Sequence, residues 1–162
     1  MARKNPDVDY EYSLDVLRDL YVASSPKQRL TVIEQRLGYK DSCPNNLVNA
    51  VSAVEGFSRM LVTKLLEQKG DDLASTYKKY RFKNPIELIE KVMEIESISD
   101  LDAYFGEDTW ELLKFAVNYR NLIVHECTYV GQDKAPSMIQ ACHDALVKLT
   151  PIAGITNYEP PF

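Results

Sequence analysis

Residues 46–69, NLVNAVSAVEGFSRMLVTKLLEQK, predict a long amphipathic helix and decide the fold class. The apolar residues of this segment recur at intervals of three and four, which places them on one face of a helix. They form a single stripe of Leu47, Ala50, Val51, Val54, Phe57, Leu61 and Leu65. Gly70 follows, and a glycine at this place commonly ends a helix. Such a stripe must be covered by another apolar surface, so we expect a bundle of helices.

A second long helix is predicted over residues 107–126, EDTWELLKFAVNYRNLIVHE. Glu107 and Asp108 begin it, and carboxylates in a first turn complement the helix dipole. Shorter helices are expected from apolar residues at helical intervals and from capping signals. They cover residues 12–23, 26–37, 71–81, a segment that opens at 85, 97–105 and 135–149. Residues 39–44 and 127–135 are expected to be loops.

Two segments carry a capping box, in which a polar side chain caps a helix and a Glu or Gln three residues later reaches back. Ser25 and Gln28 form the first box, and Asn84 and Glu87 form the second. Proline follows the capping residue in both, where its missing N–H is tolerated. We therefore expect a helix to begin at each place.

The chain of 162 residues is long enough to bury one hydrophobic core. It shows no internal repeat and no linker that would divide it. We predict a flexible N-terminal arm over residues 1–10, a single helical domain over 11–150 and an extended C-terminal tail over 151–162. The predicted fold class is all-α, a helical bundle with two long core helices and shorter flanking helices.

The overall charge and the cysteines limit the classes of function. The formal net charge is −5, so any contact with nucleic acid must use a local patch. The three cysteines, Cys43, Cys127 and Cys142, have no ligand-like spacing and are interpreted as reduced thiols of a cytoplasmic protein. The polar start does not resemble a signal peptide. No apolar run approaches the roughly 20 residues that span a bilayer, so no membrane partner is expected.

Residues 115–126, FAVNYRNLIVHE, carry the candidate site. On an ideal helix Asn121 and His125 lie one turn apart on the polar side, where their side chains can touch. Arg120 lies roughly 140° from His125, inside the apolar arc. A guanidinium is always charged, so Arg120 needs a partner or an opening to solvent.

Two interpretations of Arg120 follow. In the first, Arg120 reaches along apolar surface to water, or pairs with a carboxylate such as Glu55, which borders the apolar stripe of the other long helix. In the second, the helix end is distorted or an interface forms, so that Arg120 and His125 both contact one anion. Helix geometry alone leaves both interpretations open.

The pattern Arg120-Asn121-x-x-x-His125, late in a long helix of an all-α domain, resembles the Arg-x(4–6)-His motif of the HEPN superfamily. The resemblance covers about residues 45–150 and implies a bundle of four to five helices with the motif on a late helix. An asparagine directly after the arginine is common in that family. An acidic residue on an earlier helix often supports the motif, and Glu55 is the candidate for that role.

The resemblance implies a metal-independent endoribonuclease of a toxin–antitoxin or antiviral defence type. Such enzymes act as homodimers in which both motifs meet at one cleft. His125 would take the proton of a ribose 2′-OH or protonate the leaving 5′ oxygen. Arg120 would hold the scissile phosphate, and Asn121 would orient the imidazole or bind the phosphate. The expected partners are RNA as substrate, a second copy of the chain, and an antitoxin or another protein; no cofactor is expected.

Other HEPN domains are non-catalytic interaction modules that bind a partner protein or a nucleotide, and the acidic charge of this chain fits that class equally well. The two functions differ in the surroundings of the motif. A nuclease needs His125 open to a cleft lined by positive charge. A module would bury Arg120 against a carboxylate and leave no groove for RNA.

Residues 77–83, YKKYRFK, interleave aromatic residues with Lys78, Lys79, Arg81 and Lys83. This composition can hold a single strand by stacking and charge, and it is the first candidate for RNA binding. The alternative is a short helix with a solvated basic face, which such a composition more often forms.

The remaining candidate for chemistry is a metal site. The spacing of His125, Cys127, Cys142 and His143 matches no zinc pattern, so we predict no metal and expect both cysteines to pack in the core.

Overall fold

The computed structural model describes residues 1–23, 25, 28, 31 and 43–159. In these residues the chain forms seven α-helices and no strand, which confirms the all-α prediction. The helices are α1 (Tyr10–Ala23), α3 (Cys43–Gln68), α4 (Leu73–Tyr80), α5 (Pro85–Ile95), α6 (Leu101–Phe105), α7 (Glu107–Glu126) and α8 (Ala135–Leu149), and a short 3₁₀ helix (Thr150–Ala153) follows. Within the described residues, none of these helices has the length and apolar character needed to cross a membrane.

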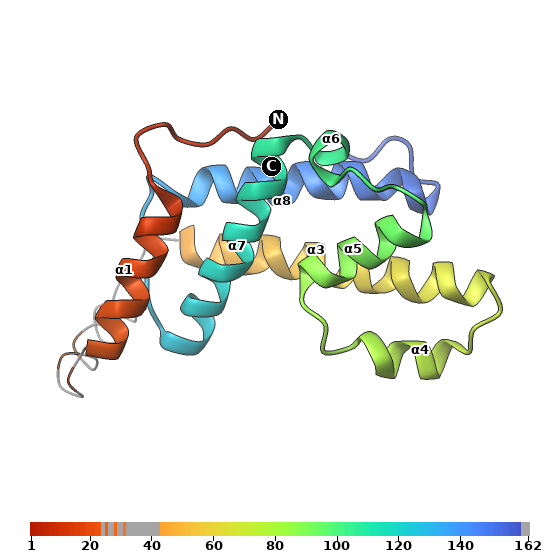
Figure 1. Cartoon of the computed structure of the whole chain (residues 1–162), viewed down its shortest axis with the longest axis horizontal. Helices are drawn as coiled ribbons and strands as arrows, with labels where there is room; N and C mark the ends of the chain where they lie inside the picture. The colour runs from red at the N-terminus through yellow and green to blue at the C-terminus, as the bar shows by residue number, and fades with distance from the viewer. Residues whose placement is uncertain (24, 26–27, 29–30, 32–42, 160–162) are drawn as a thin grey trace.

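The helices are arranged around α3 and α8, which lie side by side and run in the same direction (Figure 1). α7 crosses both of them, and α1 lies beside α7. α5 and α4 pack on α3, with α4 on the side of α3 away from α8. The two long helices predicted as the spine, α3 and α7, therefore contact each other directly, but α8 is an equal part of the core.

The core is built from the apolar faces of α3, α5, α7 and α8. In the predicted stripe of α3 the side chains of Leu47, Val51 and Val54 are fully buried, while Phe57 and Leu65 are partly buried. α7 is buried on more than one face because α1, α3 and α8 all pack against it. The fully buried side chains of the other helices include Leu88, Ile89, Val92, Met93, Leu112, Leu113, Met138 and Leu149.

Capping explains where several helices begin. Asn84 and Glu87 form the predicted capping box at the start of α5. Ser25 and Gln28 also make the predicted reciprocal hydrogen bonds, although most of the helix expected over residues 26–37 lies outside the described residues. Asp72 caps α4 by accepting a hydrogen bond from the backbone N–H of Ser75.

Two predicted helix starts are wrong by three residues or more. α3 begins at Cys43, inside the expected loop 39–44, because Pro44 suits a first helical turn rather than a loop. The helix expected from residue 97 begins only at Leu101, because Ser97 has a left-handed backbone with φ of 58° and Asp100 caps the helix.

The N-terminal segment, expected to be a flexible arm, is instead anchored across the domain. Residues 1–9 form no helix, but Ala2 is buried and its N–H donates to the carboxylate of Asp144 on α8. Lys4 forms an ion pair with Glu111 on α7. These contacts join the start of the chain to α7 and α8, across the top of the molecule in Figure 1.

Candidate functional site

Arg120 lies on the face of α7 that is turned toward α3. Its Nη2 donates to Glu55 Oε2 at 2.9 Å, and 19% of the arginine side chain is exposed. α7 stays helical as far as Glu126, so the distorted helix end considered above is absent. Arg120 therefore pairs with Glu55, the carboxylate suggested from the sequence. This matches the first interpretation, in which the guanidinium is neutralised by a carboxylate.

Glu55 also forms an ion pair with a second arginine, Arg59, on its own helix. Arg59 Nη2 donates to Glu55 Oε1 at 2.6 Å, one turn along α3. The cluster of Glu55, Arg59 and Arg120 thus holds two fixed positive charges and one carboxylate. Sequence reasoning missed Arg59, although the four-residue spacing from Glu55 is the usual spacing of an ion pair on a helix.

The pairing with Glu55 satisfies only part of the guanidinium of Arg120. Its Nε is buried and has no hydrogen-bond partner in the part of the chain that the structure describes. Leaving a buried donor unpaired is unfavourable. The orientation of Arg120 is therefore set by the ion pair with Glu55, at the expense of this donor.

Asn121 and His125 lie on the outer side of α7 and are exposed. Val124, between them in the sequence, is also exposed, by 52%. Among the described residues, no hydrogen bond or ion pair joins Arg120 to Asn121 or His125. One copy of the chain therefore presents His125 to solvent and Arg120 to α3, and does not bring the two side chains together.

The helix that carries this motif ends directly after it. Cys127 has a left-handed backbone with φ of 47° and stops α7 one residue after Glu126. His125 lies in the last turn of α7. The histidine thus lies at the free end of α7 rather than within the bundle.

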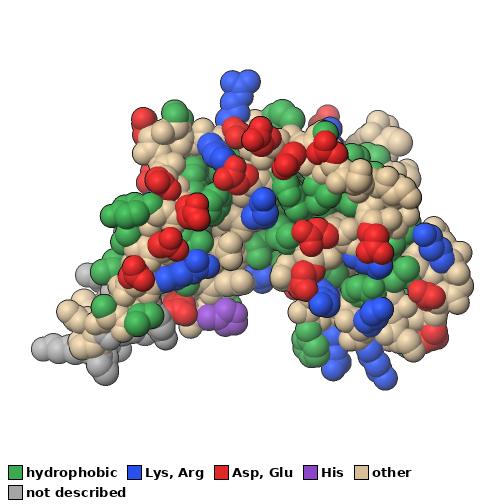
Figure 2. Space-filling model, viewed as in Figure 1, with side chains coloured by type: hydrophobic (Ala, Val, Ile, Leu, Met, Phe, Trp, Pro, Cys, Tyr) green, Lys and Arg blue, Asp and Glu red, His purple; other side chains and the backbone are tan. Residues whose placement is uncertain are grey.

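The basic segment, residues 77–83, lies next to the Glu55 cluster, because Arg59 donates to the backbone oxygens of Tyr80 and Lys83. Lys78, Lys79, Arg81 and Lys83 are all exposed, and in Figure 2 basic side chains gather over α4 and the turn that follows it. Tyr80, however, is buried, so it is not available to stack on a ligand. The exposed aromatic residues of the segment are Tyr77 and Phe82.

The other histidine and the buried cysteine belong to the core. Cys142 is fully buried, and burial raises the pKa of its thiol to about 12. His143 is buried too, and burial lowers its pKa, opposed by the negative charge of Asp144. Cys127 is partly exposed. Within the described residues, no group of three or more His, Cys, Asp or Glu side chains is placed to hold a metal ion.

No protein-family model, no curated protein and no solved structure matches this chain.

Proposed function

We propose that this chain is a HEPN-type, metal-independent endoribonuclease of a toxin–antitoxin or antiviral defence type. The observation that carries the proposal is the exposure of Asn121 and His125 on α7, the helix that also bears Arg120 and its 2.9 Å pair with Glu55. A motif arginine supported by an acidic residue from an earlier helix is what the resemblance implies. The surplus positive charge of the cluster is suited to a phosphate.

The proposed reaction needs only side chains that the motif supplies. The 2′ oxygen of a ribose attacks the neighbouring phosphorus, and the bond from phosphorus to the 5′ oxygen breaks. One imidazole accepts the 2′-OH proton and another protonates the leaving 5′ oxygen. In this proposal Arg120 would have to exchange Glu55 for the phosphate, where it stabilises the charge that develops on the phosphate oxygens. The products are a 2′,3′-cyclic phosphate and a 5′-hydroxyl.

A second copy of the chain completes this site in the proposal. The reaction uses two proton-transfer groups, and each copy supplies one His125. A dimer that pairs the exposed strip of Asn121, Val124 and His125 would bring both imidazoles to one phosphate. The exposure of Val124 supports such a contact, because an apolar side chain at 52% exposure gains stability when it is covered.

The test is cleavage of RNA by the purified full chain in the presence of EDTA, with analysis of the product ends. We expect cyclic-phosphate ends from the wild type. His125→Ala should lower the rate by roughly a hundredfold or more, because it removes both proton-transfer groups of the dimer. Arg120→Ala should lower it by a similar factor through loss of charge stabilisation.

Asn118→Ala is the matched control for Asn121→Ala, since both change an asparagine on the same helix. Only Asn121→Ala should slow cleavage. A contaminating nuclease would give the same activity in all variants, and that result would contradict the proposal. Absence of cleavage by a folded dimer on several RNAs would contradict it as well.

A non-catalytic interaction module is the second candidate. The burial of Arg120 favours this function, because its side chain is about four-fifths buried and already paired with the carboxylate of Glu55. In this function the Glu55–Arg120 pair would hold α3 and α7 together, and the exposed strip of α7 would bind a protein partner or a nucleotide. Stoichiometric binding of a protein or a nucleotide that Asn121→Ala and His125→Ala weaken, without cleavage of any RNA, would support it.

A further inference from the structure

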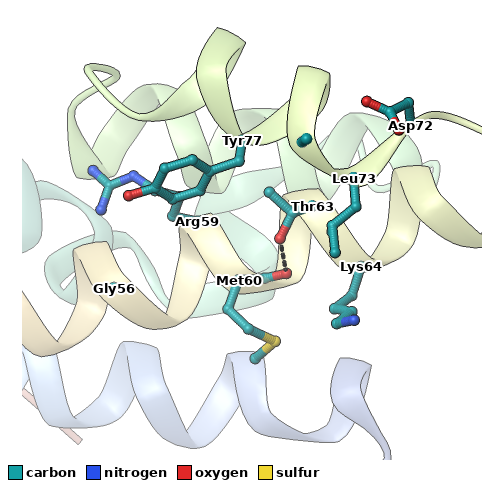
Figure 3. Close-up of a pocket in the computed structure, with 9 residues that line it drawn as sticks. Gly56, Arg59, Met60, Thr63, Lys64, Asp72, Leu73 and Tyr77 are labelled. Carbon is teal, nitrogen blue, oxygen red and sulfur yellow. Dashed lines mark hydrogen bonds between the residues drawn. The ribbon is translucent and has the colours of Figure 1, made fainter.

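A groove runs between α3 and α4, next to the Glu55 cluster (Figure 3). It has a volume of about 740 Å³. Its walls are largely apolar, and Met60, Leu73 and Tyr77 stay exposed by 37%, 40% and 53%. Gly56 leaves one end open, because no atom lies within 4 Å of the place where a Cβ would be. The hydroxyl of Thr63 donates to the backbone oxygen of Met60 at 2.8 Å, so it does not interrupt the apolar surface.

Unpaired positive charge and an exposed aromatic ring follow Tyr77, a lining residue of this groove, in the sequence. Among the described residues, no salt bridge joins Lys78, Lys79 or Arg81 to a carboxylate, whereas Lys83 pairs with Glu87 at 2.9 Å. Phe82 is 84% exposed, and the guanidinium of Arg81 lies 4.5 Å from the centre of its ring.

Arg59 connects the groove with the proposed catalytic motif. It lines the groove beside Tyr77, which reaches from α4 toward it in Figure 3. The same guanidinium binds Glu55 at 2.6 Å and donates to the backbone oxygens of Tyr80 at 3.4 Å and Lys83 at 3.5 Å. Glu55 in turn binds Arg120. The groove, the basic segment and the motif arginine therefore lie side by side.

We propose that this groove and the basic segment bind single-stranded RNA and lead its backbone to Arg120. The proposal rests on the proposed function and names the form of its substrate. Bases would stack on Phe82 and Tyr77, and Lys78, Lys79 and Arg81 would bind phosphates. A duplex keeps its bases stacked on each other and cannot use the rings in this way. An acidic protein segment would use the charges but would leave the exposed ring of Phe82 without a function.

The experiment measures binding by fluorescence anisotropy in a His125→Ala background, so that the RNA is not cut. The probe is a labelled single-stranded oligoribonucleotide of about ten nucleotides. Phe82→Ala should weaken binding about tenfold, through loss of one stacked base. The double variant Lys78→Glu, Lys79→Glu should weaken binding and lower the slope of log K against log salt by about 1.4, as expected for two lost phosphate contacts.

Matched controls are available elsewhere on the surface. Tyr12→Ala removes an aromatic side chain of α1 that is 68% exposed, and Lys148→Glu reverses one charge on α8. Neither should change binding of the RNA. Thermal unfolding of each variant checks that the exposed substitutions leave the fold intact. An unlabelled RNA duplex and polyglutamate serve as competitors.

The outcomes separate this inference from the nuclease proposal. RNA binding that depends on Phe82 and the lysines supports the groove even if the wild type cleaves nothing. Cleavage by the wild type, with binding unchanged in the Phe82 and lysine variants, overturns the groove and leaves the nuclease in place. Competition by duplex equal to that by single strands also overturns it. Equal competition by polyglutamate overturns it in favour of an acidic protein partner.

Discussion

Glu55 accepts hydrogen bonds from two arginines while only 22% of its side chain is exposed. Ion pairs on the surface contribute little, because water and salt screen them. Breaking a pair that is mostly covered is more costly, because the remaining charge loses its partner where water cannot replace it. Both Arg59 and Arg120 are mostly covered, at 18% and 19% exposure, so each would lose its counter-charge away from water if Glu55 were removed.

Glu55→Gln should therefore lower the free energy of unfolding by about 1–2 kcal/mol. The substitution keeps the shape of the side chain and removes the charge between the guanidinium groups. Urea denaturation at neutral pH measures the change. Glu67→Gln is the matched control, because Glu67 forms an exposed ion pair with Lys64 on the same helix. An equal effect of both substitutions would show that Glu55 acts as a surface charge.

For single residues, the sequence predicts the pair between the two long helices and misses the contacts that Arg59 makes with the end of α4 and the residues after it. The pairing of Arg120 with Glu55 could be predicted because Arg120 lies inside the apolar arc of one long helix and Glu55 borders the apolar stripe of the other. The contacts of Arg59 with the backbone oxygens of Tyr80 and Lys83 could not. They depend on where α4 packs, which no periodicity in the sequence records. The burial of Tyr80 has the same cause.

At the scale of helices, Gly106 sets the direction of α7. It ends α6 and begins α7 with φ of 94°, a conformation that side chains with a Cβ rarely adopt. The cap of α5, Asn84, could be predicted because a capping side chain has a chemical signature, whereas the cap of α6, Asp100, was missed. The sequence predicts a helix that ends at residue 105, directly before Gly106, but the angle between α6 and α7 comes from packing.

Gly106→Ala should lower the free energy of unfolding by about 1–2 kcal/mol, through backbone strain. A Cβ there would also meet the end of the Met1 side chain, 2.7 Å away, and that flexible side chain can move. Gly56→Ala is the opposite case, because that residue lies within α3 and faces open space. It should raise the free energy of unfolding by about 0.5–1 kcal/mol. Thermal or urea unfolding compares the two; the same sign for both would contradict the role given to Gly106.

For the molecule as a whole, the contact between α3 and α8 includes a buried histidine, His143. His143 lines a cavity of about 470 Å³ together with Asn46 and Asn49 of α3 and Tyr158 of the tail. Burial lowers its pKa from the ordinary value of 6.5. Below that pH the unfolded chain takes up a proton more readily than the folded one, so the free energy of unfolding decreases as the pH falls.

Urea denaturation just above and well below pH 6.5 should therefore show the wild type losing more stability on acidification than His143→Gln, which cannot titrate. Carboxylates contribute equally in both proteins, so the difference between them isolates the histidine. Identical pH profiles would mean that His143 binds its proton equally well in the folded and unfolded chain. The sign follows from burial, which exceeds the opposing effect of Asp144.

The sequence was least informative about contacts that cross the whole molecule. The N-terminal segment has no periodicity and was expected to be flexible, yet Ala2 and Lys4 contact residues more than a hundred positions away. The all-α class could be predicted because it follows from local periodicity and caps. The way in which two copies meet remains a proposal, since no periodicity in the sequence records which surfaces of two copies come together.

The shared carboxylate also constrains how this protein can evolve. A lineage can lose Arg59 alone, because Glu55 then keeps Arg120 as its single counter-charge. Losing Glu55 first would leave two uncompensated cations, so selection should remove such sequences before a second substitution arrives. We therefore expect diverging descendants to replace Arg59 early, and to replace Glu55 and Arg120 only together.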